Sequence, residues 1–355
     1  MGITKKALIY SPYFKGIGGG ERYMLTIAEC LLRNQWRVDL LWDKPDEIKR
    51  IGQKLNLSIK GINVLGYRVS DINFWQRMRL TRAYQVAFWL SNGSIPAIFA
   101  KKNIIHFQSP FKQVGGRKIT NQFKIGLVDE VICNSKFTKR FIDKEFGVNS
   151  EVVFPPVEVS QFNQGKKEKI ILAVGRYEPT KKHETLIKAF KLLLNKGAKD
   201  WRMVIIGGSL EKPEKNDYLT RLRQEAVKLP VKFHVNADFS VLKDYYSKAM
   251  FFWHAKGYRV ALTKPKEMEH FGITPVEAMS AGCVPLVVDK GGLRDIVRRG
   301  EGEKWKSIDE LAEKTYQLIN NSKKYEQYQR NAVQRSKDFS KTKFCHKINE
   351  IVERS

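Results

Sequence analysis

The sequence contains no uninterrupted apolar run long enough to span a bilayer, so we expect any membrane contact to be peripheral. Cysteine is also scarce, with four residues that lie far apart and lack the spacing of a metal site. We therefore expect four free, buried thiols in a reducing cytosol. Residues 1–6 lead directly into an apolar strand, which predicts no signal peptide, and Lys6 stands where a myristoylation motif needs serine or threonine. The cysteines are Cys30, Cys133, Cys283 and Cys345.

Acidic residues are few relative to basic ones. The chain of 355 residues has 37 Asp and Glu against 64 Lys and Arg, a formal net charge of +27. Such an excess indicates an anionic partner, which could be a nucleic acid, a phosphorylated ligand or an acidic membrane, although a generally basic protein is the plainer alternative. The basic residues are dispersed and form no recognisable nucleic-acid-binding module. We therefore expect no nucleic-acid partner and keep nucleic-acid binding as a remote alternative.

Buried strands alternate with helices along the chain, which predicts two α/β domains with parallel sheets. The first begins with a strand at 7–10, a glycine-rich turn at 16–20, a helix that Glu21 opens and a strand at 37–42. This succession is the opening of a doubly wound domain. Polar residues at 159–168 indicate a linker, so we expect domains at 1–160 and 161–335.

One short helix in the second domain carries the strongest chemical signal. Thr274 is the predicted N-cap, Pro275 fits the first helical position, and Glu277 sits where a capping box places its carboxylate. The N–H groups at such a helix start can bind phosphate. Glu277 therefore either caps its own helix or shares a ligand-binding cleft with Glu269, eight residues earlier, where Gly272 allows close approach to the backbone.

This stretch resembles the E-x7-E signature of retaining GT-B glycosyltransferases of the family 4 group, through Glu269, Phe271-Gly272-Ile273 and Glu277. The resemblance implies an α/β fold of two Rossmann-like domains facing across a cleft. In the family the first glutamate lies by the donor sugar, the second holds the ribose hydroxyls, and the Phe-Gly-Ile amides meet the sugar and diphosphate. The resemblance also implies that a last helix, within 336–355, crosses back to the first domain.

A second motif, Gly175-Arg176 followed by Lys181, resembles the Gly-Arg-x4-Lys pair that binds the donor diphosphate in this family. Fixed cations and N–H groups can stabilise a diphosphate leaving group without a metal, and the sequence has no Asp-x-Asp motif, so we expect no metal and no cofactor. His106 ends a strand where the family has a histidine that contacts the donor sugar; a purely structural histidine is the alternative. The resemblance assigns catalytic roles to His106, Arg176, Lys181 and Glu269, and donor binding to Gly18, Gly19, Gly20, Gly207, Phe271, Gly272, Ile273, Thr274 and Glu277.

The segment 269–273 is similar to the α1,2-mannosyltransferases of lipid-linked oligosaccharide assembly. This implies transfer of mannose from GDP-mannose, or of another hexose from a UDP sugar, to a lipid-linked or cell-envelope glycan. The alternative is a soluble glucan or disaccharide synthase of the same fold. The acid-free run 112–124 and the aromatic-basic segment 74–82 favour a cytoplasmic protein bound peripherally to the anionic inner face of the cell membrane, although 74–82 could equally be an ordinary solvated helix. The predicted acceptor or membrane patch is Lys112, Arg117, Lys118 and Lys124.

Overall fold

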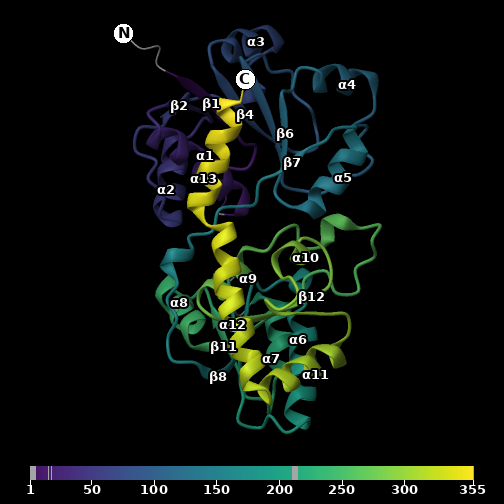
Figure 1. Ribbon diagram of the computed structural model, residues 1–355. Coiled ribbons are helices and arrows are strands. Elements are labelled where there is room, and N and C mark those ends of the chain that lie inside the picture. The colour runs from purple at the N-terminus through teal and green to yellow at the C-terminus, as the bar shows by residue number, and fades with distance from the viewer. Residues whose placement is uncertain (1–4, 15, 17, 210–214, 355) are drawn as a thin grey trace. The chain divides into compact units, whose positions relative to one another are not determined.

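The computed structural model describes residues 5–14, 16, 18–209 and 215–354, and the chain divides into two compact units (Figure 1). The first unit comprises the described residues up to Pro156 together with those from Lys341 onward, and the second runs from Val157 to Ser340. The boundaries expected from the sequence, at 160 and 336, lie within a few residues of this division. In the described part of the chain, no helix is both long and apolar enough to cross a bilayer.

The first unit is built on a sheet of seven parallel strands in the order β3-β2-β1-β4-β5-β6-β7. Its central strands are apolar on both faces, as expected for a parallel sheet that is covered on both sides, and β4 is buried at every position. The strands are β1 (Lys6–Tyr10), β2 (Arg37–Leu41), β3 (Asn63–Val64), β4 (Val86–Ser91), β5 (Lys102–Phe107), β6 (Glu130–Cys133) and β7 (Glu151–Val152). The helices are α1 (Gly19–Arg33), α2 (Pro45–Leu55), α3 (Phe74–Arg82), α4 (Ile119–Ile125), α5 (Lys136–Phe146) and α13 (Lys341–Glu353).

The second unit has a sheet of six parallel strands in the order β10-β9-β8-β11-β12-β13. The strands are β8 (Glu168–Val174), β9 (Arg202–Gly207), β10 (Val231–Val235), β11 (Ala249–His254), β12 (Val284–Val288) and β13 (Glu303–Trp305). The helices are α6 (His183–Asn195), α7 (Asp217–Glu225), α8 (Phe239–Lys248), α9 (Ile273–Ser280), α10 (Leu293–Ile296), α11 (Ile308–Ile319) and α12 (Ser322–Ser336).

Both sheets have the strand order of a doubly wound fold, which confirms the predicted α/β class. In each unit the chain builds outward from its first strand in one direction and then returns to continue on the other side. The order reverses between β1 and β4 in the first unit and between β8 and β11 in the second. Ligands of such sheets bind beyond the carboxyl ends of the strands at this reversal.

Helix α13 packs on α1 in the first unit (Figure 1). The Phe344 ring meets the Tyr23 ring edge to face, with centroids 4.9 Å apart. The Lys341 ammonium lies 2.6 Å from the buried Glu29 carboxylate. From the resemblance we expected a last helix that crosses back to the first domain, and in the structure α13 belongs to the first unit.

The prediction of four free thiols is wrong for two of them. Cys30 on α1 and Cys345 on α13 form a disulfide, with Cα atoms 5.2 Å apart and a sequence separation of 315. The packing of α13 on α1 brings the two residues together, and their spacing alone could not reveal this contact. Cys133 and Cys283 are free and buried, as expected.

The two segments proposed to face a membrane differ in structure from one another. Segment 74–82 is helix α3, and its first turn is closed by a capping box in which Asn73 and Gln76 each accept the other's backbone N–H at 2.9 Å. The run 112–124, expected to be a loop, becomes helix α4 from Ile119 onward.

Candidate functional site

The site in the second unit lies where β8 and β11 end, at the reversal of strand order. Gly175 follows β8, and its N–H donates to the carbonyl of Ile206 on β9 at 3.0 Å. Gly207, the last residue of β9, presses against this turn so closely that a Cβ atom on it would lie 2.1 Å from the Gly175 carbonyl oxygen. Packing therefore explains why position 207 is a glycine, while its predicted contact with the donor stays a prediction.

Arg176 follows directly and points its guanidinium towards solvent, 3.3 Å from Glu178. A cavity of about 340 Å³ opens beside it, and Asn216, Tyr218 and Arg221 line another part of that cavity. The arginine is thus free to turn towards an anion that arrives from solvent.

Glu269 is the centre of a largely buried charge cluster. Its carboxylate lies 3.2 Å from the Lys181 ammonium, 3.7 Å from the Lys256 ammonium and 3.5 Å from Nε2 of His254. Burial raises the pKa of the Glu269 carboxyl, but Lys181, Lys256 and His254 outweigh burial and hold this pKa well below its usual value. Glu269 is therefore ionised. Burial lowers the pKa of His254, so its imidazole is neutral at pH 7.

The structure brings together Glu269 and Lys181, which the sequence analysis had singled out, and adds His254 and Lys256, which it had not. His254 is the last residue of β11, the strand on the other side of the reversal from β8, and Lys256 follows shortly after it. The rule that ligands bind at the carboxyl ends of such strands could have identified them, once β11 was placed beside β8.

A pair of glycines fixes the backbone of Glu269. The N–H of Gly292 donates to the Glu269 carbonyl at 2.8 Å. A Cβ atom on Gly291 would lie 2.3 Å from the Glu269 carbonyl oxygen, and one on Gly292 would lie 2.0 Å from that of His270. Side chains at these two positions would push the loop away, so the glycines hold the carboxylate in place.

Helix α9 begins earlier than predicted. Its N-cap is Gly272, with φ at 111°, where a side chain would be strained, and Ile273 is the first helical residue. Thr274 is therefore not the N-cap and Pro275 is not the first helical residue.

Glu277 is the fifth residue of α9, beyond the position that a capping box requires. Its carboxylate accepts a hydrogen bond from the buried Tyr246 hydroxyl at 3.0 Å. The idea that Glu277 serves only as a cap of its own helix is therefore wrong.

The remaining predicted donor residues lie at this helix start. The first N–H groups of α9, those of Ile273 and Thr274, have no partner within the helix, since the first turn of any helix leaves its N–H groups unpaired. These N–H groups can therefore donate hydrogen bonds to an anion. The Phe271 side chain is buried against Phe339, with ring centroids 5.5 Å apart, so only its backbone is available to a ligand.

The glycine turn of the first unit leads into α1. Gly18 is its N-cap and Gly19 and Gly20 are its first residues, so the helix begins before Glu21. A Cβ atom on Gly18 would lie 2.9 Å from the Glu21 carboxylate, and one on Gly20 would lie 2.9 Å from the Gln108 amide oxygen. These glycines leave room for polar side chains that close over the turn. Positions 15 and 17 of this turn lie outside the described residues.

His106, also in the first unit, is buried at the end of β5. Its ring stacks on Tyr23 with centroids 3.8 Å apart, and Nδ1 lies 3.3 Å from the Ile132 carbonyl oxygen. Burial lowers the pKa of His106 to about 3, so the ring is neutral. Its Nε2 atom has no hydrogen-bond partner in the described residues, and its predicted contact with a donor sugar stays a prediction.

The predicted acceptor or membrane patch lies beside a cavity of about 860 Å³ in the first unit, lined in part by Lys112, Arg117 and Lys118. Lys124 is on α4. The Glu145 carboxylate shapes the loop because it accepts backbone N–H groups from Gln113, Val114 and Gly116 at 2.9, 2.9 and 3.2 Å. The four cations are exposed to solvent or nearly so.

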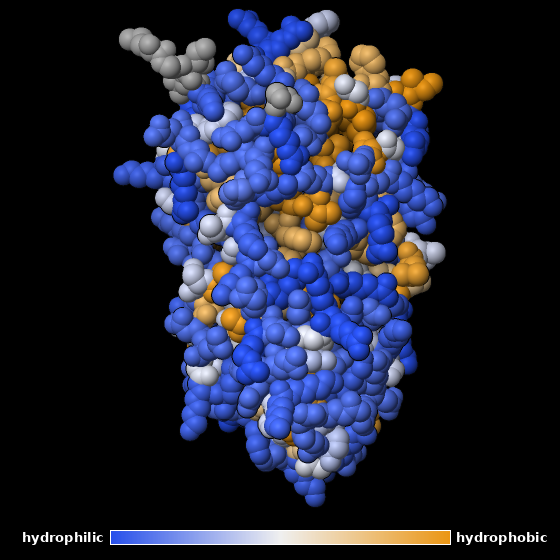
Figure 2. Space-filling model, viewed as in Figure 1, coloured by the Kyte–Doolittle hydropathy of each residue, from blue (hydrophilic) through white to orange (hydrophobic). Residues whose placement is uncertain are grey.

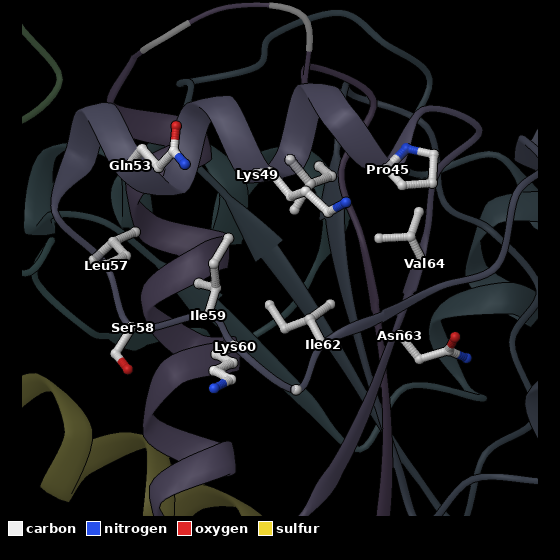
Figure 3. Close-up of a pocket in the computed structure, with 12 residues that line it drawn as sticks. Pro45, Lys49, Gln53, Leu57, Ser58, Ile59, Lys60, Ile62, Asn63 and Val64 are labelled. Atoms are coloured by element: carbon white, nitrogen blue, oxygen red, sulfur yellow. The ribbon is translucent and has the colours of Figure 1, made fainter.

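Another cavity of the first unit, of about 640 Å³, lies between α2 and residues 57–64 (Figure 3). Its walls are mostly apolar, and Lys49 and Lys60 belong to its lining. The residues predicted from the sequence lie elsewhere, so this cavity is separate from the groups described above. The apolar residues of its lining are Ile48, Leu57, Ile59, Ile62 and Val64.

Two family models match the chain. The model described as glycosyl transferases group 1 covers residues 157–335, and the model described as glycosyltransferase family 4 covers residues 17–161. A curated relative is the GDP-Man:Man(3)GlcNAc(2)-PP-Dol alpha-1,2-mannosyltransferase of Mus musculus, 32% identical over 202 residues, which are 51% of this chain and 39% of the relative. Another is the alpha-1,3/1,6-mannosyltransferase ALG2 of Kluyveromyces lactis, 32% identical over 212 residues, 49% of this chain and 41% of that protein. The chain thus spans about two fifths of the length of these relatives.

Solved structures show the same fold over nearly the whole chain. The glycosyltransferase of Rickettsia africae ESF-5 superposes with a TM-score of 0.77 at 15% identity and covers 99% of this chain and 98% of its own. Anabaena Alr3699/HepE in complex with UDP gives a TM-score of 0.74 at 18% identity and covers 98% and 99%. At these identities the likeness concerns the fold alone. The chain belongs to the glycosyl transferases group 1 family of enzymes and has their GT-B architecture of two Rossmann-like domains.

Proposed function

We propose that the protein transfers a hexose, with mannose favoured, from a nucleoside diphosphate sugar to a lipid-linked or cell-envelope glycan. The observation that carries the proposal is the cluster of Glu269, Lys181 and Lys256 at the strand-order reversal of the second unit, next to the start of α9. The relatives named as mannosyltransferases, one of them for GDP-Man, favour mannose as the sugar.

The charges of the site suit the departure of a nucleoside diphosphate. Negative charge grows on the phosphate oxygens as the sugar leaves, and fixed cations and N–H groups stabilise it. Arg176 and Lys181 supply the cations in this proposal, and the start of α9 supplies the N–H groups. Transfer then needs no metal, and a chelator should leave the rate unchanged.

Glu269 is proposed to position the sugar. An ionised carboxylate accepts hydrogen bonds and cannot protonate a leaving group, and the pKa of Glu269 lies well below its usual value. It therefore suits the sugar hydroxyls, while Glu277 on α9 is proposed to hold the ribose. Retention of configuration would follow from attack on the face that the diphosphate leaves, with a donor phosphate oxygen taking the acceptor proton.

A thermal-shift panel of nucleosides, nucleoside diphosphates and sugar nucleotides tests the donor. A ligand that binds only the folded state stabilises it by about 2.7 kcal/mol at a hundred times its Kd. We expect GDP-mannose to give the largest shift, and analysis of the product anomer then tests retention. The absence of a shift with every nucleoside diphosphate would contradict the proposal.

We propose that the protein binds its acceptor at a membrane surface. The first unit exposes apolar side chains beside its basic residues, with Trp75 of α3 69% exposed and Ile119 and Phe123 of α4 88% and 74% exposed. Figure 2 shows apolar surface in the region of these two helices. Apolar side chains that enter the headgroup region, flanked by cations, are typical of peripheral attachment to anionic lipids.

Liposome co-sedimentation tests this attachment. The variant neutralises Lys112, Arg117, Lys118 and Lys124; the matched control neutralises Lys191, Lys199, Lys228 and Lys232, which are exposed and lie in the second unit. Each basic residue near an anionic surface contributes about 1 kcal/mol, so the first variant should lose binding and the control should keep most of it. Binding should also weaken with salt. Equal binding by both variants, or equal binding to neutral vesicles, would favour the alternative of a soluble acceptor.

A further inference from the structure

Lys167 and Lys256 of the second unit are both largely buried, and they differ in what their ammonium groups contact. Lys167 donates to the carbonyls of Ala281 and Tyr246 at 2.7 and 3.4 Å and lies 4.0 Å from the Cys283 sulfur. Its donors are therefore taken up by fixed groups of α8 and of the end of α9. This is the environment of a structural lysine.

Lys256 has no such environment. Its side chain is only 17% exposed, and its ammonium lies 3.7 Å from Glu269, beyond hydrogen-bond length. It donates no hydrogen bond to any residue in the described ranges. An ammonium group has three donors, and since Lys256 Nζ is not among the fully buried polar atoms without a partner in the described residues, its donors still reach solvent. The structure thus holds a largely buried cation whose donors remain available to a ligand.

The local backbone holds Lys256 at the site. The next residue, Gly257, has φ at 103°, and the Tyr258 N–H closes a turn on the Ala255 carbonyl at 2.9 Å. The Tyr258 ring packs on Trp305 at 5.2 Å between centroids. Lys256 is therefore preorganised by a packed connection and not carried on a free loop.

The charges of the cluster are unbalanced. Lys181 and Lys256 together face one carboxylate, that of Glu269, and His254 is neutral. One positive charge is left over, on lysine side chains that are only 18% and 17% exposed. A phosphate group that enters beside Lys181 would meet both ammonium groups.

We propose that Lys256 is a third cation of the donor site and binds the diphosphate of the nucleotide sugar. On donor binding it exchanges its contact with Glu269 for the phosphate oxygens, and the Glu269 carboxylate becomes available to the sugar hydroxyls. The inference rests on the function proposed above and adds to it a residue that binds the phosphate groups of the donor.

The test is calorimetric titration of GDP and guanosine, and of UDP and uridine, into three variants. Lys256→Met should lower the affinity for the diphosphate by roughly 10- to 100-fold, because it removes contacts to a charged group, and should leave the nucleoside unchanged. Lys256→Arg keeps the charge and should recover much of the affinity. The matched control is Lys264→Met, since Lys264 is on the same connection but is 65% exposed and pairs with Glu267; it should bind like the wild type.

A purely structural Lys256 predicts a different result. Lys256→Met would then lose the diphosphate and the nucleoside equally and melt earlier, as Lys167→Met is expected to do, and this would overturn the inference. Unchanged diphosphate affinity would overturn it too. Failure of the wild type to bind any nucleoside diphosphate would instead remove the proposed function itself, and the inference with it.

The variant Glu269→Gln tests the proposed exchange of the Lys256 contact from Glu269 to the phosphate oxygens. Without the competing carboxylate, GDP should bind at least as tightly as in the wild type, whereas GDP-mannose should lose its advantage over GDP. Weaker GDP binding by Glu269→Gln would contradict the exchange.

Discussion

The two sheets share one strand order but carry different chemistry beyond the carboxyl ends of their strands. In the second unit the strand ends hold ionised groups, Glu269 and two lysines, in a largely buried cluster. In the first unit the end of β5 holds the neutral His106 ring stacked on Tyr23, and its cations are exposed on loops and on α4. Strand order therefore fixes where a site lies, and the residues after each strand decide what it binds.

The largest effect that would test this difference between the units is expected when the cations of the second unit are removed. Arg176→Ala and Lys181→Ala should each reduce turnover by roughly 100- to 1,000-fold, about 2.7–4 kcal/mol, because each removes a cation proposed to contact the leaving diphosphate. Steady-state kinetics with GDP-mannose measures the loss. Lys196→Ala, which removes an exposed cation paired with Glu313, is the matched control. Near-normal turnover by either variant would exclude that residue from the diphosphate site.

A smaller effect is expected at Glu277, the residue proposed to hold the ribose. Glu277→Ala should weaken nucleotide binding by about 1.5–3 kcal/mol, since hydrogen bonds to a charged group are lost. A 2′,3′-dideoxy nucleotide lacks the ribose hydroxyls and should bind the variant and the wild type with the same affinity. Glu277→Gln is the companion variant because its amide oxygen can still accept from the Tyr246 hydroxyl. It should keep the melting temperature while still weakening ribose binding. Normal nucleotide affinity with early unfolding of Glu277→Ala would reduce Glu277 to a structural role.

The smallest expected effect is on the pH dependence of the free energy of unfolding, which can be followed in each unit separately. Burial lowers the pKa of His106 and His183 to about 3, and burial also lowers that of His254, from an ordinary value of 6.5. Below pH 6.5 these histidines therefore become protonated in the unfolded chain but stay neutral in the folded chain. The free energy of unfolding falls as the pH drops. His106 and His183 should each contribute about 1.4 kcal/mol in total between pH 7.5 and 5.5, because the slope reaches its full value only well below pH 6.5. Urea unfolding between pH 7.5 and 5.5, followed by a probe in each unit, measures the slope.

One variant calibrates that slope. His183→Gln should remove one histidine's contribution in the second unit and leave the response of the first unit, which depends on His106, unchanged. A slope that His183→Gln does not alter would mean that His183 is already charged or solvated in the folded protein.

The sequence predicted the repetitive parts of the molecule well because they depend on local pattern. Buried runs between glycine turns gave both parallel sheets, and the Glu269 and Lys181 motifs met at one strand-order reversal. The start of α9 was misplaced because Thr274 and Pro275 form a good local signal, whereas a glycine at positive φ begins the helix two residues earlier. Local capping preference gave way to the packing of this loop on Gly291 and Gly292.

Contacts between distant segments were beyond the local pattern. Lys256 has an ordinary sequence context, and only the pairing of β11 with β8 places it beside Glu269. The Cys30–Cys345 bond likewise depends on the docking of α13. Both results come from tertiary packing, which no spacing rule encodes.

The place of α13 in the first unit sets an order of events on the ribosome. The nascent chain emerges from its N-terminal end, so all of residues 157–340 are made before α13 can reach α1. Until then the face of α1 around Glu29 and Cys30 lies open to solvent or to chaperones. Translation that stops anywhere before Lys341 would leave an incomplete first domain, even if every residue up to Pro156 had been made.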